Sequence, residues 1–450
     1  MPSTRRDFIK TSAAAGTFLA LAGAPAILRA GAQDKVRLGI IGTGLRGRWH
    51  LKLGCDRSDT VVTAICDIDA AALDESQALI STAGGRKAAE YGRNGDPEAW
   101  RDMLAKESLD VVIIATPWQW HTPQAVMAME HGIVAGIEVP CAVSIAECWD
   151  LVNTYERTGT PCMIMENVCY RRDVMAVLNM VRQEMFGELL HLEGGYQHDL
   201  REVKFNDGKQ PYGGGVEFGE KGFSEAKWRT DHSVHRNGDI YPTHGLGPVA
   251  TMTNINRGNR FVSLSSTATK SRGLQKYITE KGGADHPNAK VRFALGDIVT
   301  TVLRTQHGET ILLSHDTNGP RPYSLGFRVQ GTQGIWMDIN KSLYLEGISP
   351  TAHRWEEAAP YLEQYDHPLW QKFAAEAEGG GHGGMDFFVV NALIEAVKNG
   401  QKPPLDAYDA ATWSAISPLS EQSIAMGSSA VEVPDFTRGK WMHRKDVFAG

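Results

Sequence analysis

The stretch VRLGIIGTGLRGRWH, residues 36–50, decides the fold of the first half of this 450-residue chain. Its apolar start predicts a short β-strand, and Gly42, Gly44 and Gly47 follow in the spacing G-x-G-x-x-G before a predicted helix. The next predicted strand, TVVTAICDID, ends in Asp67. A strand, a glycine turn, a helix and an acid after the second strand are together typical of a dinucleotide-binding domain.

These residues also favour one cofactor. Glycines let the backbone approach a pyrophosphate at the N-terminus of a helix. The carboxylate of Asp67 accepts hydrogen bonds from a ribose diol and repels a 2′-phosphate group, which disfavours NADP. The sequence therefore predicts a Rossmann domain that binds NAD.

Strand and helix signals continue to alternate after Asp67. We expect strands at 109–116, 133–139 and 162–167, and helices at 122–130 and 144–157. This alternation predicts a doubly wound parallel sheet, and ligands of such sheets bind at the carboxyl edge of the strands.

Aromatic and polar residues follow three of these strands. They are TPWQWH at 116–121, EVP at 138–140 and ENVCYRR at 166–172. Trp118, Trp120 and His121 either pack the edge of the domain or line the nicotinamide side of the site. Their position at the ends of strands favours the second interpretation.

The pattern changes after Arg172. A predicted helix at 174–185 is followed by long segments of alternating polarity at 298–317 and 325–347, which predict strands of a mostly antiparallel sheet. The stretch MDFFVVNALIEAVKNG, residues 385–400, predicts a helix that packs back on the body of the protein. The fold class is therefore α/β, with a Rossmann sheet followed by an α+β domain.

The first thirty-odd residues predict an export signal. Arg5 and Arg6 precede Phe8 in STRRDFIK, and an alanine-rich apolar run follows. This pattern is typical of a twin-arginine signal, the substrate of an export machinery that carries a folded protein across the membrane. We expect a periplasmic or secreted protein with a signal at 1–32, an NAD-binding domain at 33–172 and a substrate domain at 173–450.

The composition indicates an ordinary globular protein with a small-molecule partner. The formal net charge is −7 and the Lys and Arg residues are scattered, so nothing indicates nucleic acid or an anionic membrane as a partner. No metal is expected, and an oligomer stays possible. The cysteines form no C-x-x-C pair, and we interpret them as buried structural thiols: Cys55, Cys66, Cys141, Cys148, Cys162 and Cys169.

The stretch GGGHGGMD, residues 379–386, places His382 among five glycines. Glycine loses more backbone entropy than other residues on ordering, so we expect a mobile loop. Three interpretations stay open from the residues alone: a histidine in a linker, a fragment of a metal site, and a titratable group that moves to and from a substrate.

Two features resemble a large family of sugar oxidoreductases. The E-x-P turn at Glu138 to Pro140 and the downstream NGDIYPTHG are similar to those of glucose-fructose oxidoreductases and inositol dehydrogenases. In that family the middle residue of the turn is commonly a lysine that helps to deprotonate the substrate hydroxyl. This chain has Val139, which cannot take a proton, so the resemblance to a net dehydrogenase is weakest at its catalytic position.

Further motifs resemble family 109 of the glycoside hydrolases. They are ATPWQWHTP, ENVCYRRDVMAVLNMVRQ, GGYQHDLREVKFN, GFSEAKWRT, NGDIYPTHGLGP, HDTNGPRPYSLGFRVQGT, YDHPLW and GGHGGMD, and they cover nearly the whole mature chain. The resemblance implies an NAD-containing α-N-acetylgalactosaminidase that needs no metal.

The resemblance also implies which residues bind the two ligands. Cofactor contacts fall on Leu45, Arg46, Asp67, Trp118, Gln119, Trp120, His121, Glu138, Val139 and Asn167. Sugar contacts fall on Tyr196, Arg229, Tyr241, Pro242, Thr243, His244 and Tyr323. An ordinary salt bridge is the alternative for Arg229, and packed, hydrogen-bonded side chains are the alternative for the tyrosines and His244.

An NAD-dependent hydrolysis assigns roles to four of these residues. Oxidation of the sugar at C3 makes the C2 hydrogen acidic, so the C1 substituent is expelled by elimination, water adds, and C3 is reduced again. His382 serves as acid and base at C1, and His244 handles the C3 hydroxyl proton. Tyr241 and Tyr196 are candidates for polarising the ketone or moving the C2 proton, and Glu166 for a supporting acid.

Two other classes of function stay open. A periplasmic sugar oxidoreductase consumes NAD in proportion to turnover, whereas a hydrolase keeps it through many turnovers. A sugar-binding protein without activity binds N-acetylgalactosamine and releases no nitrophenol from a nitrophenyl glycoside.

Overall fold

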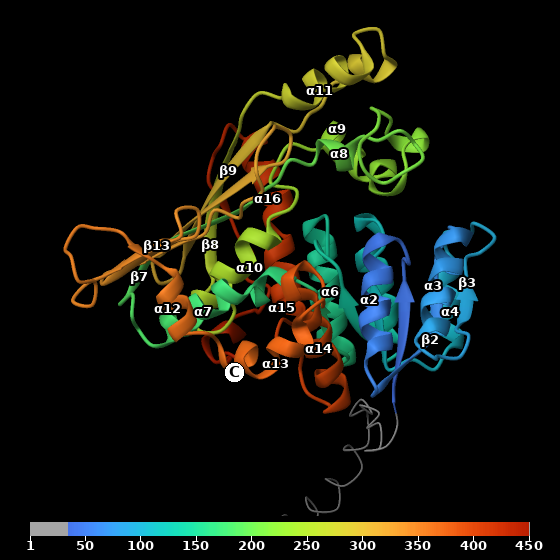
Figure 1. Ribbon diagram of the computed structural model, residues 1–450, viewed down its shortest axis with the longest axis horizontal. Helices are drawn as coiled ribbons and strands as arrows, with labels where there is room; N and C mark the ends of the chain where they lie inside the picture. Colours follow the sequence, from blue (N-terminus) through green and yellow to red (C-terminus); the bar gives the residue numbers. More distant parts are fainter. Residues whose placement is uncertain (1–34, 450) are drawn as a thin grey trace, which may run out of the picture.

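The computed structural model describes residues 35–449 (Figure 1). The expected twin-arginine signal at 1–32 lies outside the described residues. Two sheets organise the described part of the chain, and the expected order of a Rossmann sheet followed by a mostly antiparallel sheet is confirmed.

The first sheet is parallel and six-stranded within the described residues. Its spatial order is β3 (Ala89–Tyr91), β2 (Thr60–Cys66), β1 (Val36–Ile41), β4 (Val111–Ile114), β5 (Val134–Ile137) and β6 (Cys162–Ile164). The helices between these strands are α2 (Leu45–Asp56), α3 (Ala70–Thr82), α4 (Ala99–Lys106), α5 (His121–Glu130) and α6 (Ile145–Thr158).

Continuous apolar runs produce these central strands. All four residues of β4, VVII, are buried, as expected where helices cover both faces of a parallel sheet. The helix expected at 144–157 is α6, and its start is set by Ser144, whose hydroxyl accepts a hydrogen bond from the backbone N–H of Glu147.

The second sheet is nine-stranded within residues 35–449 and mostly antiparallel. Its order is β14 (Glu356–Glu357), β13 (Ser342–Leu345), β12 (Gly334–Met337), β11 (Arg328–Gly331), β7 (Leu189–Gln197), β10 (Thr310–Asp316), β9 (Ile298–Thr305), β8 (Phe261–Ala268) and β15 (Val431–Glu432). Strands β7 and β10 pair in parallel, and the other neighbours pair in antiparallel fashion.

Helices pack around the second sheet and return to the first. They are α7 (Arg172–Arg182), α8 (Arg201–Lys204), α9 (Arg229–His235), α10 (Thr243–Met252), α11 (Gly273–Gly282), α12 (Ala359–Gln364), α13 (Pro368–Ala377), α14 (Met385–Lys398), α15 (Ala407–Ser414) and α16 (Ile416–Ala425). Short 3₁₀ turns that matter for the site are η1 (Trp118–Trp120), η2 (Asn167–Tyr170), η4 (Ser224–Lys227) and η6 (His382–Gly384).

Helix α10 touches strand β7 because glycine lies on both sides of the contact. A Cβ on Gly194 would lie 2.4 Å from the carbonyl oxygen of Gly245, and a Cβ on Gly245 would lie 2.2 Å from the backbone nitrogen of Gly195. This close approach brings His244, at the start of α10, next to Tyr196 on β7, with ring centroids 5.2 Å apart.

Helix α14, near the C-terminus, packs on the Rossmann domain. Helix α14 lies beside α2, near the middle of Figure 1. Arg57, which follows α2, donates hydrogen bonds to Asn391 and Glu395 of α14 at 2.5 and 2.6 Å. The element that begins just after His382 is therefore fixed to the nucleotide-binding domain.

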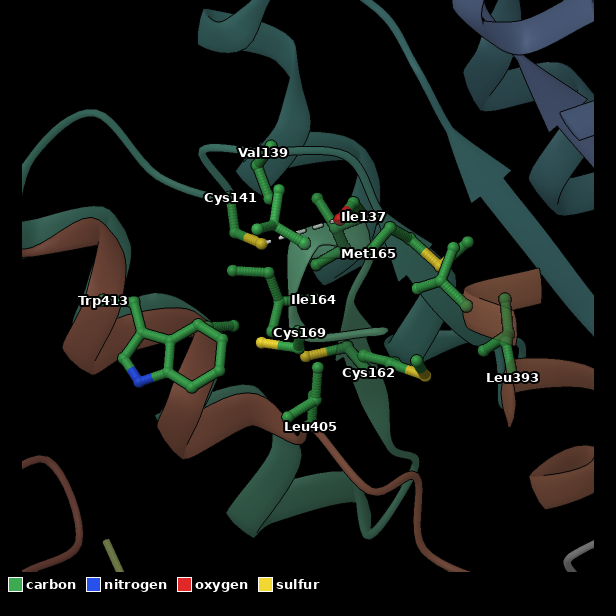
Figure 2. Close-up of a cluster of buried hydrophobic side chains, with 14 of the residues drawn as sticks. Ile137, Val139, Cys141, Cys162, Ile164, Met165, Cys169, Leu393, Leu405 and Trp413 are labelled. Carbon is green, nitrogen blue, oxygen red and sulfur yellow. Dashed lines mark hydrogen bonds between the residues drawn. The ribbon is translucent and has the colours of Figure 1, made fainter. Parts of the chain in front are cut away.

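Three of the cysteines lie in the core between the first sheet and the C-terminal helices. Figure 2 shows Cys141, Cys162 and Cys169 among apolar side chains that include Leu393 of α14 and Trp413 of α15. The expectation of buried thiols holds for Cys66, Cys141, Cys148, Cys162 and Cys169, and is wrong for Cys55, which is only half-buried near the end of α2. Between residues 35 and 449, no helix combines the length and apolar character needed to cross a membrane.

Candidate active site

A cavity of about 560 Å³ lies where the carboxyl edge of the first sheet meets β7, η4, α9 and α10. Residues from the two parts of the chain line it together. The lining from the first part includes Gly42, Gly44, Leu45, Arg46, Trp49, Asp67, Trp118, Trp120, His121, Glu138, Val139 and Asn167. The lining from the second part is Tyr196, Tyr212, Ser224, Glu225, Trp228, Arg229, Tyr241, His244 and His382.

The three glycines of the G-x-G-x-x-G turn are required for different structural reasons. Gly42 has a positive φ of 84°, and a Cβ there would lie 2.7 Å from the backbone of Ala115. A Cβ on Gly47 would lie 1.7 Å from the carbonyl oxygen of Gly42, so both residues are needed to close the turn. A Cβ on Gly44 would meet no atom within 4 Å, which leaves open space where a pyrophosphate approaches the start of α2.

Asp67 lies at the cavity where β2 ends. Its carboxylate accepts hydrogen bonds from the backbone N–H of Thr43, at 2.6 Å, and of Asp69, at 2.9 Å. Burial raises the pKa of this carboxyl, and the hydrogen bonds from the backbone oppose that rise. A carboxylate held beside the glycine turn suits a ribose diol, so the residues present fit NAD.

Arg46 and Glu138, both expected to contact the cofactor, pair with one another at the cavity wall. The Nε of Arg46 donates to Glu138 at 2.6 Å, and the Nε2 of His50 lies 2.5 Å from the same carboxylate oxygen. Burial raises the pKa of Glu138, but the charge of Arg46 and the hydrogen bond with His50 outweigh it and lower the pKa to about 2.

His382 is held by a buried carboxylate. Its Nδ1 lies 2.6 Å from Oδ2 of Asp386, whose side chain is fully buried, while 61% of the imidazole is exposed. Asp386 also accepts two hydrogen bonds from Arg46, at 2.7 and 2.9 Å, and one from Asn167 at 2.7 Å. Burial raises the pKa of Asp386, but the hydrogen bond from His382 and the Arg46 guanidinium hold it far below its usual value.

A second imidazole is held in the same manner. The Nδ1 of His244 lies 2.7 Å from Oε1 of Glu166, and this oxygen also accepts a hydrogen bond from the backbone N–H of Val168 at 3.0 Å. The Glu166 side chain is fully buried. The supporting role expected of Glu166 therefore has a geometric basis, since the carboxylate orients the ring and stabilises its cationic form.

Aromatic rings and one cation line the cavity beside His244. Tyr241 lies 4.8 Å from Tyr196 and 5.6 Å from Trp118, measured between ring centroids. The guanidinium of Arg229 lies 5.0 Å from the Tyr241 ring and 5.3 Å from the Trp118 ring, and it pairs with Glu225. Arg229 has both the salt bridge of the ordinary interpretation and a place at the cavity.

Two residues expected to contact the cofactor, His121 and Trp120, also make contacts within the first domain. Both ring nitrogens of His121 lie 2.7 Å from backbone carbonyl oxygens, those of Pro140 and Thr116, so its ring joins two turns of the domain edge. Trp120 packs against Trp100 at 6.5 Å between ring centroids. Both interpretations of this segment thus have support, since His121 and Trp120 also line the cavity.

Five of the predicted residues lie outside the cavity lining. Gly47 is buried in the turn, and Gln119 is exposed to solvent. Pro242 and Thr243 begin α10 and place His244. Tyr323 is 51% exposed and packs edge-on against His198, with ring centroids 4.9 Å apart.

Sequence reasoning missed several residues of the site. Asp386 and Glu225 each stand four positions from a predicted residue, His382 and Arg229 respectively, but neither pair lies within one α-helix, so the spacing alone did not predict the contact. Trp49 and Trp228 lie within quoted motifs without having been selected, and Tyr212 lies in none of them; all three line the cavity. The described residues hold no cluster of His, Cys, Asp and Glu suited to a metal, and the imidazole of His382 contacts Asp386 and Arg46.

Two family models match the chain. Residues 36–166 match the oxidoreductase family with an NAD-binding Rossmann fold, and residues 170–443 match the C-terminal domain of glycosyl hydrolase 109. NAD is therefore the cofactor of the first domain.

Solved structures show the same fold at low sequence identity. A levoglucosan dehydrogenase in complex with NADH and levoglucosan is 19% identical, with a TM-score of 0.64 over 89% of this chain and 100% of that one. The myo-inositol dehydrogenase of Lactobacillus casei is 15% identical, with a TM-score of 0.58 over 89% and 99%.

Curated relatives are similar along their whole length. A glycosyl hydrolase family 109 protein of Stenotrophomonas maltophilia is 54% identical over 99% of this chain and 98% of its own. An α-N-acetylgalactosaminidase of Tannerella forsythia is 48% identical over the full length of both chains. With the C-terminal family model and these identities, the chain belongs to glycoside hydrolase family 109, whose members are glycosidases built on an NAD-binding oxidoreductase fold.

Proposed function

We propose that this glycosidase hydrolyses terminal α-linked N-acetylgalactosaminides through a temporary oxidation at C3 of the sugar. The observation that carries this proposal is the presence of two imidazole–carboxylate pairs, His244 with Glu166 and His382 with Asp386, at one cavity with the nucleotide-binding glycine turn. NAD, when bound, supplies the reversible oxidation of C3.

His244 serves the C3 hydroxyl. Because Glu166 holds Nδ1, Nε2 is the ring nitrogen left to face the substrate. It accepts the hydroxyl proton as C3 becomes a ketone and returns it when C3 is reduced. The buried Glu166 carboxylate stabilises the imidazolium that forms.

Tyr196 and Tyr241 act at the C3 ketone and at the neighbouring carbon, C2. A ketone at C3 makes the C2 hydrogen acidic, and loss of this hydrogen expels the oxygen at C1. Both phenols lie on the cavity wall beside His244, where they polarise the ketone and move the C2 proton. Arg229 lies over the rings of Tyr241 and Trp118 and binds the N-acetyl carbonyl or a ring hydroxyl.

His382 serves the oxygen at C1. Its ring is held at Nδ1 by Asp386 and is otherwise mostly exposed, so Nε2 reaches the leaving group. It donates a proton to the departing oxygen and takes one from the water that adds afterwards. The mobility expected of its glycine loop stays a prediction.

Val139 weighs against net oxidation of a sugar. It lines the cavity, is 3% exposed and carries no group that takes a proton. This chain therefore lacks the base that the sugar oxidoreductases commonly carry at this position, and His244 takes the hydroxyl proton instead.

Cofactor consumption tests the proposal. Purified protein with no added NAD is given nitrophenyl α-N-acetylgalactosaminide in heavy water. We expect many turnovers per bound NAD and deuterium at C2 of the released sugar. Turnover that stops after one equivalent of NAD would show a net oxidoreductase, and binding without nitrophenol release would show a sugar-binding protein.

We also propose export to the periplasm. Arg5, Arg6 and Phe8 in STRRDFIK support a twin-arginine signal. Replacing both arginines with lysine is expected to retain the full-length protein in the cytoplasm, as measured by cell fractionation, and unchanged export would contradict the proposal.

A further inference from the structure

His198 lies behind Tyr196 as seen from the cavity. The phenol of Tyr196 lines the cavity, whereas His198 does not. The hydroxyl oxygen of Tyr196 lies 3.2 Å from Nδ1 of His198, and the two rings meet edge-to-face with centroids 5.7 Å apart. His198 follows β7 by one residue, so the strand that carries Tyr196 also carries its partner.

The charge of Arg229 limits the direction of this hydrogen bond. It acts on the Tyr196 phenol as a cation that lowers the pKa, and a guanidinium only donates, so Arg229 offers the hydroxyl hydrogen of Tyr196 no acceptor. Nδ1 of His198 is the acceptor at hydrogen-bond distance.

The surroundings of His198 keep its ring neutral. Burial lowers the pKa of His198 and the nearby Arg229 charge lowers it further, while Asp199 raises it and His244 lowers it. The carboxylate of Asp199 is itself paired with Arg201. A neutral imidazole has one nitrogen free to accept a proton, as this geometry requires.

We propose that His198 is a positioning residue that accepts the phenolic proton of Tyr196, so that the Tyr196 oxygen removes the C2 proton of the oxidised sugar. This inference rests on the proposed function and assigns the C2 proton to one of its two candidate tyrosines.

The step balances without any further reactant. The O–H bond of Tyr196 breaks as the N–H bond of His198 forms, which leaves a phenolate and an imidazolium. The phenolate then takes the C2 proton, and the electron pair of the C2–H bond moves toward the C3 ketone as the C1 oxygen leaves. Burial raises the pKa of the Tyr196 phenol, and the positive charge of Arg229 opposes that rise and stabilises the phenolate.

The half-buried position of His198 connects the step with solvent. After elimination Tyr196 is a phenol again, and the imidazolium loses its proton to water. Hydrogen at C2 therefore exchanges with solvent through His198, and the rate of that exchange reports on this residue.

The experiment uses the holoenzyme and 2-acetamido-1,5-anhydro-2-deoxygalactitol, a sugar that has no glycosidic oxygen to expel. Absorbance of bound NADH measures oxidation at C3, and deuterium incorporation from heavy water at C2 measures proton removal. The variant is His198→Gln, whose amide oxygen accepts a hydrogen bond from Tyr196 but takes no proton. The matched control is His191→Gln, at the start of the same strand and bonded to Thr310 outside the cavity.

We expect wild type and His191→Gln to form NADH and exchange C2. His198→Gln is expected to form NADH to the same extent and to exchange C2 about 10²-fold more slowly. The pH profile of C2 exchange is also expected to differ between the two proteins: wild type is expected to slow at low pH, where a protonated His198 cannot accept the phenolic proton, and His198→Gln is expected to lack this dependence.

Exchange in His198→Gln at the wild-type rate would overturn the inference. If wild type forms no NADH with the sugar, the proposed function fails and this inference fails with it. If His198→Gln does not fold or forms no NADH, His198→Asn is measured in the same way: slower C2 exchange with NADH retained supports the inference, and exchange at the wild-type rate refutes it.

Discussion

Nδ1 of His382 lies 2.6 Å from Oδ2 of Asp386, a fully buried carboxylate that also binds Arg46 and Asn167. Arg46 belongs to the helix after the glycine turn, and Asn167 follows the last strand of the first sheet. The Asp386 side chain thus links the nucleotide-binding domain to the loop that carries His382. Through this link the His382 ring is positioned relative to the cofactor site.

Asp386→Asn removes the charge that orients His382. We expect turnover of alkyl N-acetylgalactosaminides to fall about 10²-fold or more, since the ring loses its fixed direction and the stabilisation of its cationic form. The control is Glu395→Gln on the same helix, 40% exposed and paired with Arg57 away from the cavity. Equal turnover in the two variants would contradict the assignment.

His382→Ala tests the role at C1 through the leaving group. A missing general acid is expected to slow poorly activated alkyl glycosides by about 10²- to 10⁴-fold. Nitrophenyl glycosides are expected to lose much less, because nitrophenolate departs without a proton. Steady-state rates across a series of leaving groups measure the difference, and equal losses in both classes would leave His382 as part of a lid only.

Gly381→Ala is expected to disturb the glycine loop around His382 because the added methyl group clashes with its neighbours. Gly381 has φ of 82°, and a Cβ there would lie 2.0 Å from Nε1 of Trp49 and 2.6 Å from Oδ2 of Asp386. Gly383 has φ of 68°, and a Cβ there would have no atom within 4 Å. Gly383→Ala therefore costs only the backbone strain, about 1–2 kcal/mol. We expect Gly381→Ala to lose much more turnover than Gly383→Ala. Equal losses of turnover in the two variants would mean that backbone strain, and not the contacts with Trp49 and Asp386, causes the loss.

Asp67→Asn tests the choice of cofactor. Loss of the charge weakens the hydrogen bonds to the ribose diol and removes the repulsion of a 2′-phosphate. We expect the dissociation constant for NAD to rise at least about tenfold and that for NADP to fall, as measured by calorimetric titration of cofactor-free protein. Asp69→Asn, which alters the neighbouring acid that caps α3, is the control and is expected to change neither preference.

Glu138→Gln is expected to change how stability depends on pH. The pKa of Glu138 is lowered from 4.5 to about 2, so the folded state binds fewer protons than the unfolded state between these values. The resulting stability is complete above about pH 4.5 and is lost as pH falls through about 2. It amounts to a few kcal/mol, since one pKa unit corresponds to about 1.4 kcal/mol.

Chemical denaturation of wild type and Glu138→Gln at several pH values measures this effect. The difference in unfolding free energy is expected to be largest near neutral pH and to shrink toward pH 2. A difference that stays constant over this range would show that the carboxylate titrates alike in the folded and unfolded states.

Patterns within short stretches of the sequence were enough to predict the fold and part of the site. The glycine turn at Gly42, the acid at Asp67 and the alternation of strands and helices are local features, and each lies where expected. Parallel strands bring their carboxyl ends to one edge, so residues after three strands were predicted to share a cavity, and Trp118, Glu138 and Asn167 do line one.

The sequence by itself predicted the two sheets, the NAD-binding domain and two imidazoles that line the cavity, His244 and His382. Only the tertiary structure decided which side chains distant in the sequence fix these imidazoles and their carboxylates. Arg46 meets Asp386 across 340 residues of chain and His244 meets Glu166 across 78, and no local period encodes such pairs. These contacts arise because Gly247 lets α10 lie close to Glu166 and because α14 packs on α2. A buried carboxylate is then stable only beside a hydrogen-bond donor or a cation.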